Sequence, residues 1–234
     1  ALNQLINVLN DSDLIAFDLV TTSAVPMEAE IIGISFSVKE HEGYYIPLRY
    51  PEKEKNNFGE DDEKIVIDKL SKFFEDQSKL KTAQNIKYNS LILKKFGIYI
   101  EGISFDTMVA AHLINPSAKS ISIDTLSIEY FNYEMVPILD LIGRGKNQIN
   151  LDEVHLEKVA FYASEYSDIS LQLTKILKFK LKEKELFTYF NTIELPLLKV
   201  LTQMEFIGTF VDVNLLKTMS QKISDKLDSI TSSI

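Results

Sequence analysis

Cysteine is absent from this 234-residue chain. The chain can therefore form no disulfide, no thiolate metal site and no cysteine nucleophile. Histidine is also scarce, because only His41, His112 and His155 occur, widely separated and in no ligand-like spacing. A zinc site or a histidine-based catalytic triad is therefore not expected.

Arginine and long apolar runs are scarce as well. Only Arg49 and Arg144 occur, and the formal net charge is −9, which argues against a general nucleic-acid-binding surface. No apolar run approaches the ~20 residues of a membrane span, and the chain begins at Ala1 without the basic segment of a signal peptide. We therefore expect a cytoplasmic protein without a membrane contact, and a piece of a longer chain because no methionine begins it.

The residues that are present are those of an ordinary globular domain. Apolar residues make up 45% of the chain and charged residues 25%, and the length allows one large domain with or without a fragment of a second. Leu14–Val20 is an apolar run between polar turn formers, which indicates a strand buried on both faces. Asp18 interrupts this run and shares a face of the strand with Ala16 and Val20. A buried carboxylate requires a partner or a metal ion.

The hydrophobic pattern predicts strands that are followed by, and then alternate with, helices. Strands are predicted at 14–20, 31–38, 43–48, 81–84 and 103–105. Helices are predicted at 3–9, 63–74, within 85–96, from 106, from 124, from 152 to about 184, around 193–206 and from 214, with a charged loop at 51–62. Short links predict antiparallel pairing of the first three strands. The fold class is therefore α/β, a mixed five-stranded sheet with helices on both faces and further helices at the C-terminus; a ribonuclease H-like sheet fits this order, as do other α/β folds.

Four segments carry a resemblance when they are read together. They are Phe17–Val20, Gln84–Asn89, Phe105–Met108 and Tyr162–Asp168. In this order and at these separations they resemble the 3′–5′ exonuclease (proofreading) domain of bacterial DNA polymerase I, family A. The segment Gly143–Gln148 also resembles that family's polar turn before the last motif.

Later segments resemble the entry into the polymerase domain of the same family. They are Glu194–Leu198, Met204–Gly208 and the pair Val211 and Asp212. The resemblance implies a ribonuclease H-like exonuclease domain at residues 1–184 and, at 185–234, the truncated first helices of the polymerase (thumb-side) domain. It implies a fragment of a DNA-directed DNA polymerase, a transferase of DNA replication and repair, whose partners are DNA and the rest of the polymerase chain. The polymerase active site would lie beyond Ile234, and we expect a monomer.

The family's exonuclease holds two Mg²⁺ or Mn²⁺ ions with four carboxylates. Carried over residue by residue, the first acid is Asp18, whereas the other three positions hold Val20, Asn89 and Tyr166. Tyr162, which leads the last motif and helps to orient the attacking water in the family, is present. Valine cannot bind a metal, asparagine is a weak neutral ligand and a phenol is protonated near neutral pH. We therefore expect a vestigial site without a metal cofactor, in which Asp18 is the only remaining ligand; Val20 and Tyr166 would fill the place of a nucleotide if they face one cleft.

Two alternatives remain open. An active exonuclease with a rearranged metal site would need substitute acids, and Glu165 and Asp168 flank Tyr166, although on a helix they point about 100° and 200° away from it. A non-catalytic module that binds single-stranded DNA would need cations, and Arg144 and Lys146 in the polar turn could contact phosphates. Otherwise that turn is a solvated loop.

Overall fold

The computed structural model of the chain describes residues 2–49, 60–145 and 148–233. The strands are β1 (Leu14–Thr21), β2 (Ile31–Lys39), β3 (Glu42–Pro47), β4 (Leu80–Ala83) and β5 (Ile103–Asp106). The helices are α1 (Leu2–Asn10), α2 (Glu60–Glu75), α3 (Ile86–Lys95), α4 (Thr107–Ile114), α5 (Ile123–Phe131), α6 (Ile138–Ile142), α7 (Leu156–Glu183), α8 (Phe187–Tyr189), α9 (Leu195–Ile207) and α10 (Val213–Thr231). Most of the loop predicted at 51–62, and Lys146 of the polar turn, lie outside the described residues.

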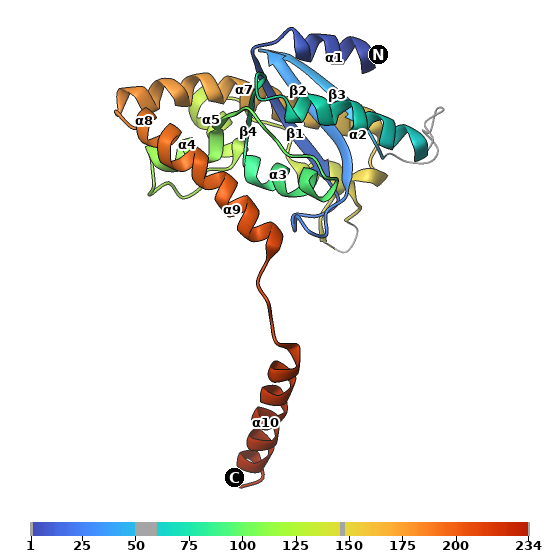
Figure 1. The fold of residues 1–234 in the computed structure, drawn as a ribbon, viewed down its shortest axis with the longest axis vertical. Helices are drawn as coiled ribbons and strands as arrows, with labels where there is room; N and C mark the ends of the chain where they lie inside the picture. The colour runs from blue at the N-terminus through green and yellow to red at the C-terminus, as the bar shows by residue number, and fades with distance from the viewer. Residues whose placement is uncertain (1, 50–59, 146–147, 234) are drawn as a thin grey trace.

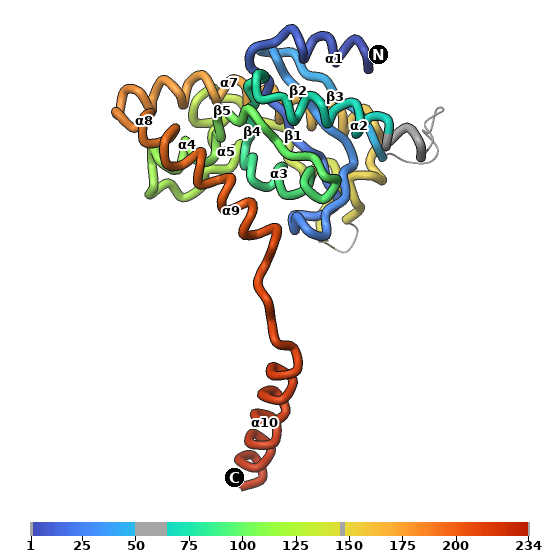
Figure 2. Tube along the Cα trace, in the orientation of Figure 1, coloured from blue at the N-terminus to red at the C-terminus, as the bar shows by residue number. Residues whose placement is uncertain are grey.

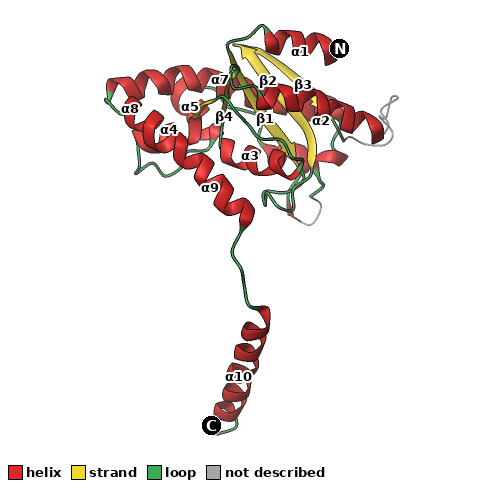
Figure 3. Cartoon of the chain, viewed as in Figure 1, coloured by secondary structure: helices red, strands yellow, loops and turns green. Residues whose placement is uncertain are grey.

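The five strands form one mixed sheet in the order β3-β2-β1-β4-β5. β2 pairs antiparallel with both β1 and β3, whereas β4 pairs parallel with both β1 and β5. The predicted hairpin order and mixed sheet are confirmed, and the sheet is ribonuclease H-like. Figure 3 shows the strands surrounded by helices. β1 lies at the centre of the sheet, so its side chains reach both covering layers.

The two faces of β1 contact different apolar layers. Phe17 and Leu19 belong to the largest core cluster, to which α1, α2 and α3 contribute. The ring of Phe17 packs edge to face against Phe74 of α2, with centroids 5.1 Å apart. Val20 belongs to a separate cluster on the opposite face. The predicted alternation along the strand is therefore confirmed, and it places Asp18 on the face of Val20.

Helix α7 covers this second face and contacts β1, β2, β3 and β4. The sheet presents small polar side chains beneath it, and the hydroxyl of Thr82 lies 2.7 Å from that of Thr174 on α7. A side chain at Gly43 would collide with Ser164 of α7, so helix and sheet approach closely. The helix begins at Leu156 rather than at the predicted 152, because residues 151–153 form a 3-10 turn.

The last segments of the chain divide into a packed part and a projecting part. α8 continues through a π-helical turn at Phe190–Glu194 into α9, where a helix was predicted around 193–206. We call the sheet and the helices that cover it the body of the protein. α9 lies against this body beside α3, whereas α10 projects away from it (Figures 1 and 2). Within the described ranges, no helix is both long and apolar enough to cross a lipid bilayer.

A fully buried lysine in β4 was not predicted. The ammonium group of Lys81 donates hydrogen bonds to the backbone carbonyls of Asp76, Lys79 and Glu101 at 2.7, 3.0 and 2.9 Å. It also lies 5.0 Å from the centroid of the Phe73 ring. Burial lowers the pKa of Lys81 to about 8. This lysine joins the end of α2 to the segment before β5 without a carboxylate partner in the described hydrogen bonds.

Candidate functional site

The carboxyl group of Asp18 lies at the centre of the sheet, beneath α7. The side chain is partly buried, and burial raises the pKa of Asp18 to about 7, against the lowering effect of hydrogen bonds from Asn89 and the backbone of Leu19. Without a metal ion, the surroundings of Asp18 therefore favour the neutral acid, whereas divalent cations bound nearby would favour the charged form.

Asn89, the fourth residue of α3, reaches Asp18 from the first turn of that helix. The chain turns from β4 into α3 through Asn85, whose φ of 57° is a left-handed conformation that asparagine tolerates. The side-chain Nδ2 of Asn89 donates a 3.3 Å hydrogen bond to Asp18. The Oδ1 atom of Asn89 is buried without a hydrogen-bond partner among the described atoms.

Ser35 adds a second unsatisfied oxygen beside Asp18. It lies directly opposite Asp18 in the antiparallel pairing of β1 and β2, so both side chains share a face. Its hydroxyl is fully buried and, within the described structure, has no partner. Across the next strand, Tyr45 pairs with Ser35 and also has a buried, unpartnered hydroxyl. These oxygens belong to neutral hydroxyl groups, so they are not carboxylate ligands. Buried polar sites of this kind commonly bind water.

Val20 occupies an apolar pocket instead of a metal site. It is only 4% exposed and packs with Val154, Val159 and Ala163, together with Ile32 of β2. Partly buried side chains of the α6 region and the following turn cover the same cluster; they are Leu141, Ile142 and Leu151. The position at which the family has a glutamate is therefore surrounded by hydrocarbon.

Tyr162 and Tyr166 project from consecutive turns of α7, with ring centroids 6.2 Å apart. Burial raises the pKa of both phenols above the ordinary value of 10, and the charge of Asp18 raises them further. Burial and the same charge also raise the pKa of Tyr88, whose hydroxyl lies 2.6 Å from that of Thr21. The groups near Asp18 on α7 are therefore neutral phenols, and Tyr166 also packs into the cluster around α5 and α7.

The acids that flank Tyr166 are engaged elsewhere. Glu165 accepts hydrogen bonds from the hydroxyl of Tyr133 at 2.6 Å and from the backbone N–H of Val136 at 2.9 Å. Asp168 accepts a hydrogen bond from the backbone of His41 in the β2–β3 turn at 2.8 Å. These contacts hold both carboxylates to neighbouring loops.

Asp106 is also a structural acid, at the N-cap of the helix predicted from 106. It is fully buried and accepts hydrogen bonds from the N–H groups of Met108 and Val109 at the start of α4 and from that of Ile86 at the start of α3. Burial raises its pKa, although these donors lower it. One carboxylate thus supports two helix N-termini, including the helix that carries Asn89.

The two cations predicted to contact DNA are not brought to Asp18 by any described contact. Arg144 is exposed in the turn after α6, between Gly143 and Gly145, both at positive φ. Lys146 lies outside the described residues. A role for this turn in binding phosphate therefore stays a prediction.

The donor set at Asp18 does not fit two divalent cations. It consists of one carboxyl group with a raised pKa, one amide oxygen and one serine hydroxyl. Among residues whose placement is described, no group of three or more His, Cys, Asp or Glu side chains is arranged to hold a metal ion. Mg²⁺ and Mn²⁺ prefer hard, charged oxygen ligands. The arrangement therefore offers hydrogen bonding and packing, but not the charge that would generate a hydroxide.

The four segments that contain Asp18, Asn89, Asp106 and Tyr166, together with the ribonuclease H-like sheet, define the class of protein, which is a nuclease-type domain. The chain belongs to the 3′–5′ exonuclease family, whose model matches residues 1–182. It is 33% identical over 227 residues to DNA polymerase I of Pseudomonas aeruginosa, a match that covers 94% of this chain and 24% of the relative. It is 35% identical over 236 residues to DNA polymerase I of Borreliella burgdorferi, covering 100% of this chain and 25% of the relative. The relationship is thus to the 3′–5′ exonuclease domain of DNA polymerase I, and the chain spans about a quarter of these relatives.

Solved structures share the fold at low sequence identity. The POL domain of Pol1 from M. smegmatis, in complex with DNA primer-template and dNTP, superposes with a TM-score of 0.74 at 19% identity, covering 97% of this chain and 34% of that chain. NrnC of Brucella melitensis superposes with a TM-score of 0.67 at 14% identity, covering 86% of this chain and 88% of that chain. At these identities the likeness concerns the fold alone.

Proposed function

We propose that this domain has lost the 3′–5′ exonuclease chemistry of its family and has a structural role within a DNA polymerase I of replication and repair. The observation that carries the proposal is the state of the four acid positions. One of them, Asp18, keeps its carboxyl group, and its pKa is raised by burial to about 7. Val20 lies in hydrocarbon, Asn89 donates to Asp18, and Tyr166 is a partly buried phenol.

The loss of charge removes the basis of the two-metal mechanism. Two divalent ions bring four positive charges next to a phosphodiester, and the ligands must offset them. A single carboxyl group leaves most of that charge unbalanced. The neutral side chains retained around Asp18 preserve the packing of β1, α3 and α7, so the fold survives the loss. DNA would then be a partner of the parent polymerase rather than a substrate of this domain, in the cytoplasm.

A nuclease assay tests the proposal. The purified chain is incubated with single-stranded DNA labelled at its 3′ end, in the presence of Mg²⁺ or Mn²⁺, and the products are separated by size. We expect no metal-dependent release of mononucleotides. Release that disappears in the Asp18→Ala variant, but persists in an Asp13→Ala control, would overturn the proposal and establish a rearranged active site.

A further inference from the structure

The sequence of helix α9 resembles the entry into the polymerase domain. The helix nevertheless packs on the exonuclease-like domain. The family model ends at residue 182, whereas the side chains continue to pack on the body well beyond that residue. Phe190 is fully buried, with its ring 4.8 Å from that of Phe105 on β5. Leu195 contacts both large core clusters, and Leu198 is 7% exposed within the first of them.

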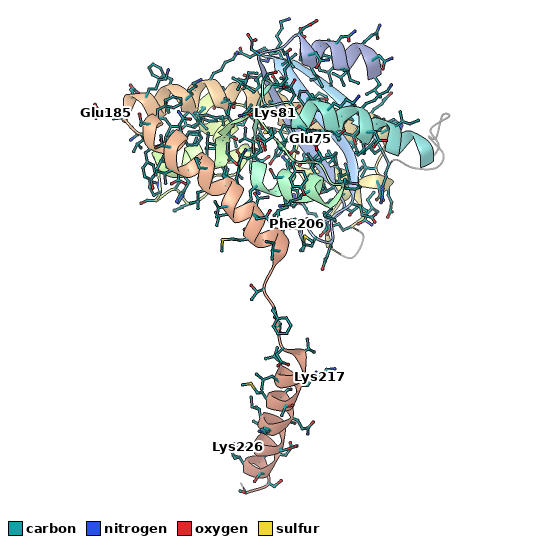
Figure 4. The ribbon with its side chains drawn as sticks, in the orientation of Figure 1. Glu75, Lys81, Glu185, Phe206, Lys217 and Lys226 are labelled. Carbon is teal, nitrogen blue, oxygen red and sulfur yellow. The ribbon has the colours of Figure 1, made fainter. Side chains whose placement is uncertain are left out.

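The contact between α3 and α9 is specific as well as apolar. The ammonium group of Lys94 lies over two aromatic rings, 4.7 Å from the centroid of Phe206 on α9 and 5.5 Å from that of Tyr99. The same group donates a hydrogen bond to the side chain of Gln203 on α9. A cation between two aromatic faces is directional and is strengthened by partial burial. Figure 4 shows Phe206 at the end of α9, next to the body.

Two ion pairs flank this contact. Lys87 of α3 pairs with Glu205 of α9, and Lys199 of α9 pairs with Glu101 of the segment before β5, at 2.6 Å. Exposed ion pairs of this kind add little free energy of stabilisation. Because α9 provides the acid in one pair and the base in the other, the two pairs specify how α9 lies against α3 and the segment before β5. A cavity of about 190 Å³ remains between the two helices, lined in part by Ile98. An incompletely packed contact with a polar rim is typical of an interface between domains.

The packing stops abruptly after α9. Gly208 has a φ of 72°, and residues 208–212 form neither helix nor strand. Phe210 is 91% exposed, and every described residue of α10 is exposed. Lys217 and Lys226 of α10 point into solvent, far from the body (Figure 4). The joint in the chain therefore lies at 208–212, well beyond residue 182, where the match to the family model ends.

We infer that the surface formed by α3 and residues 98–101 is a docking surface for α9, through which the exonuclease-like body holds the polymerase part of the chain. The inference rests on the proposed structural role and specifies the contact that performs it. Lys94 is the central residue of this surface because it contacts two residues of α9 and one of the body. The joint at 208–212 is then the place where the polymerase part changes direction relative to the body.

Limited proteolysis of the 234-residue chain with chymotrypsin tests the position of the joint. We expect the first cut after Phe210, mapped by mass spectrometry, and its loss in a Phe210→Ala variant. A first cut near the family boundary, after Phe187 or Tyr189, would overturn the inference. The assay contains neither DNA nor metal, so its outcome is independent of the nuclease assay.

Hydrogen exchange tests the role of Lys94 in the same chain. We expect slow amide exchange in α9, comparable to α3, and fast exchange in α10. Lys94→Ala should accelerate exchange in α9 about five- to tenfold, as expected for the loss of a partly buried cation–aromatic contact. The matched control is Lys217→Ala on exposed α10, which should leave α9 unchanged. Equal exchange of α9 in the Lys94 variant and the wild type would refute the docking role.

Discussion

Val20 and Asp18 are neighbours on one face of β1, yet their surroundings differ in kind. Val20 packs against hydrocarbon from α7 and the segment before it, whereas Asp18 lies among amide, hydroxyl and phenol groups. The first environment tolerates no charge, and the second tolerates a carboxyl group best when it is protonated. Each difference leads to a measurable consequence.

A glutamate at position 20 is expected to destabilise the protein rather than rebuild its site. Val20→Glu would place a carboxylate against Val154, Val159 and Ala163, at a cost of about 2–4 kcal/mol in the free energy of unfolding. Val200→Glu is the control, because Val200 is 54% exposed on α9 and its substitution should cost about 0.5 kcal/mol or less. Urea denaturation followed by circular dichroism measures both. Equal midpoints for the two variants would show that the cluster around Val20 opens readily.

The pKa of Asp18 predicts a pH-dependent stability. Burial raises this pKa from 3.8 to about 7, so between those values the folded chain keeps a proton that the unfolded chain has lost, and the free energy of unfolding falls as the pH rises. Asp18→Asn should therefore match the wild type near pH 4 and exceed it by about 1–3 kcal/mol near pH 8. Asp13→Asn, at an exposed position before β1, is the control. Parallel stability profiles for Asp18→Asn and the wild type would contradict the raised pKa.

At the scale of elements, Asp106 connects helices that are far apart in the sequence. Asp106→Ala would leave the buried N–H group of Ile86 and the partly buried N–H groups of Met108 and Val109 without this acceptor, at a cost of about 2–4 kcal/mol. Asp124→Ala removes an exposed acid from the first turn of α5 and should cost about 0.3–1 kcal/mol. Thermal or urea unfolding of both variants measures the difference. Similar losses would mean that Asp106 acts only as an ordinary cap.

The same elements show what the sequence could predict. The run around Asp18 specified a central strand and its two faces, because alternation along a strand is local and a shift by one residue would bury the wrong side chains. The segments that hold Val20, Asn89 and Tyr166 could also be recognised from the sequence, whereas the loss of acids at these positions stays a prediction. α6 was not predicted, because five residues are too short to show a helical period. The burial of Lys81 depends on carbonyls from residues 76, 79 and 101, which only the folded chain brings together.

At the scale of the whole molecule, charge predicts weak binding of nucleic acid. The net charge is −9, and several surface lysines are already paired with glutamates, including Lys39 with Glu42 and Lys175 with Glu40. Fluorescence anisotropy with a single-stranded oligothymidine should show a Kd weaker than about 100 µM at physiological salt. Tighter binding that weakens in Arg144→Ala, but not in Arg49→Ala, would support a DNA-binding module instead.

The apolar cluster around Val20 would also make the proposed loss of activity difficult to reverse. A chain that regained glutamate at this position by one substitution would carry a buried charge, while Asn89 and Tyr166 still offered no charged ligand to offset it. Each single step back would therefore lower stability without restoring catalysis, and selection would remove it before the next step occurred. Under the proposed function, hydrocarbon packing at Val20 would therefore oppose a stepwise return to a metal-binding site, because each single substitution would cost stability before the other two could offset it.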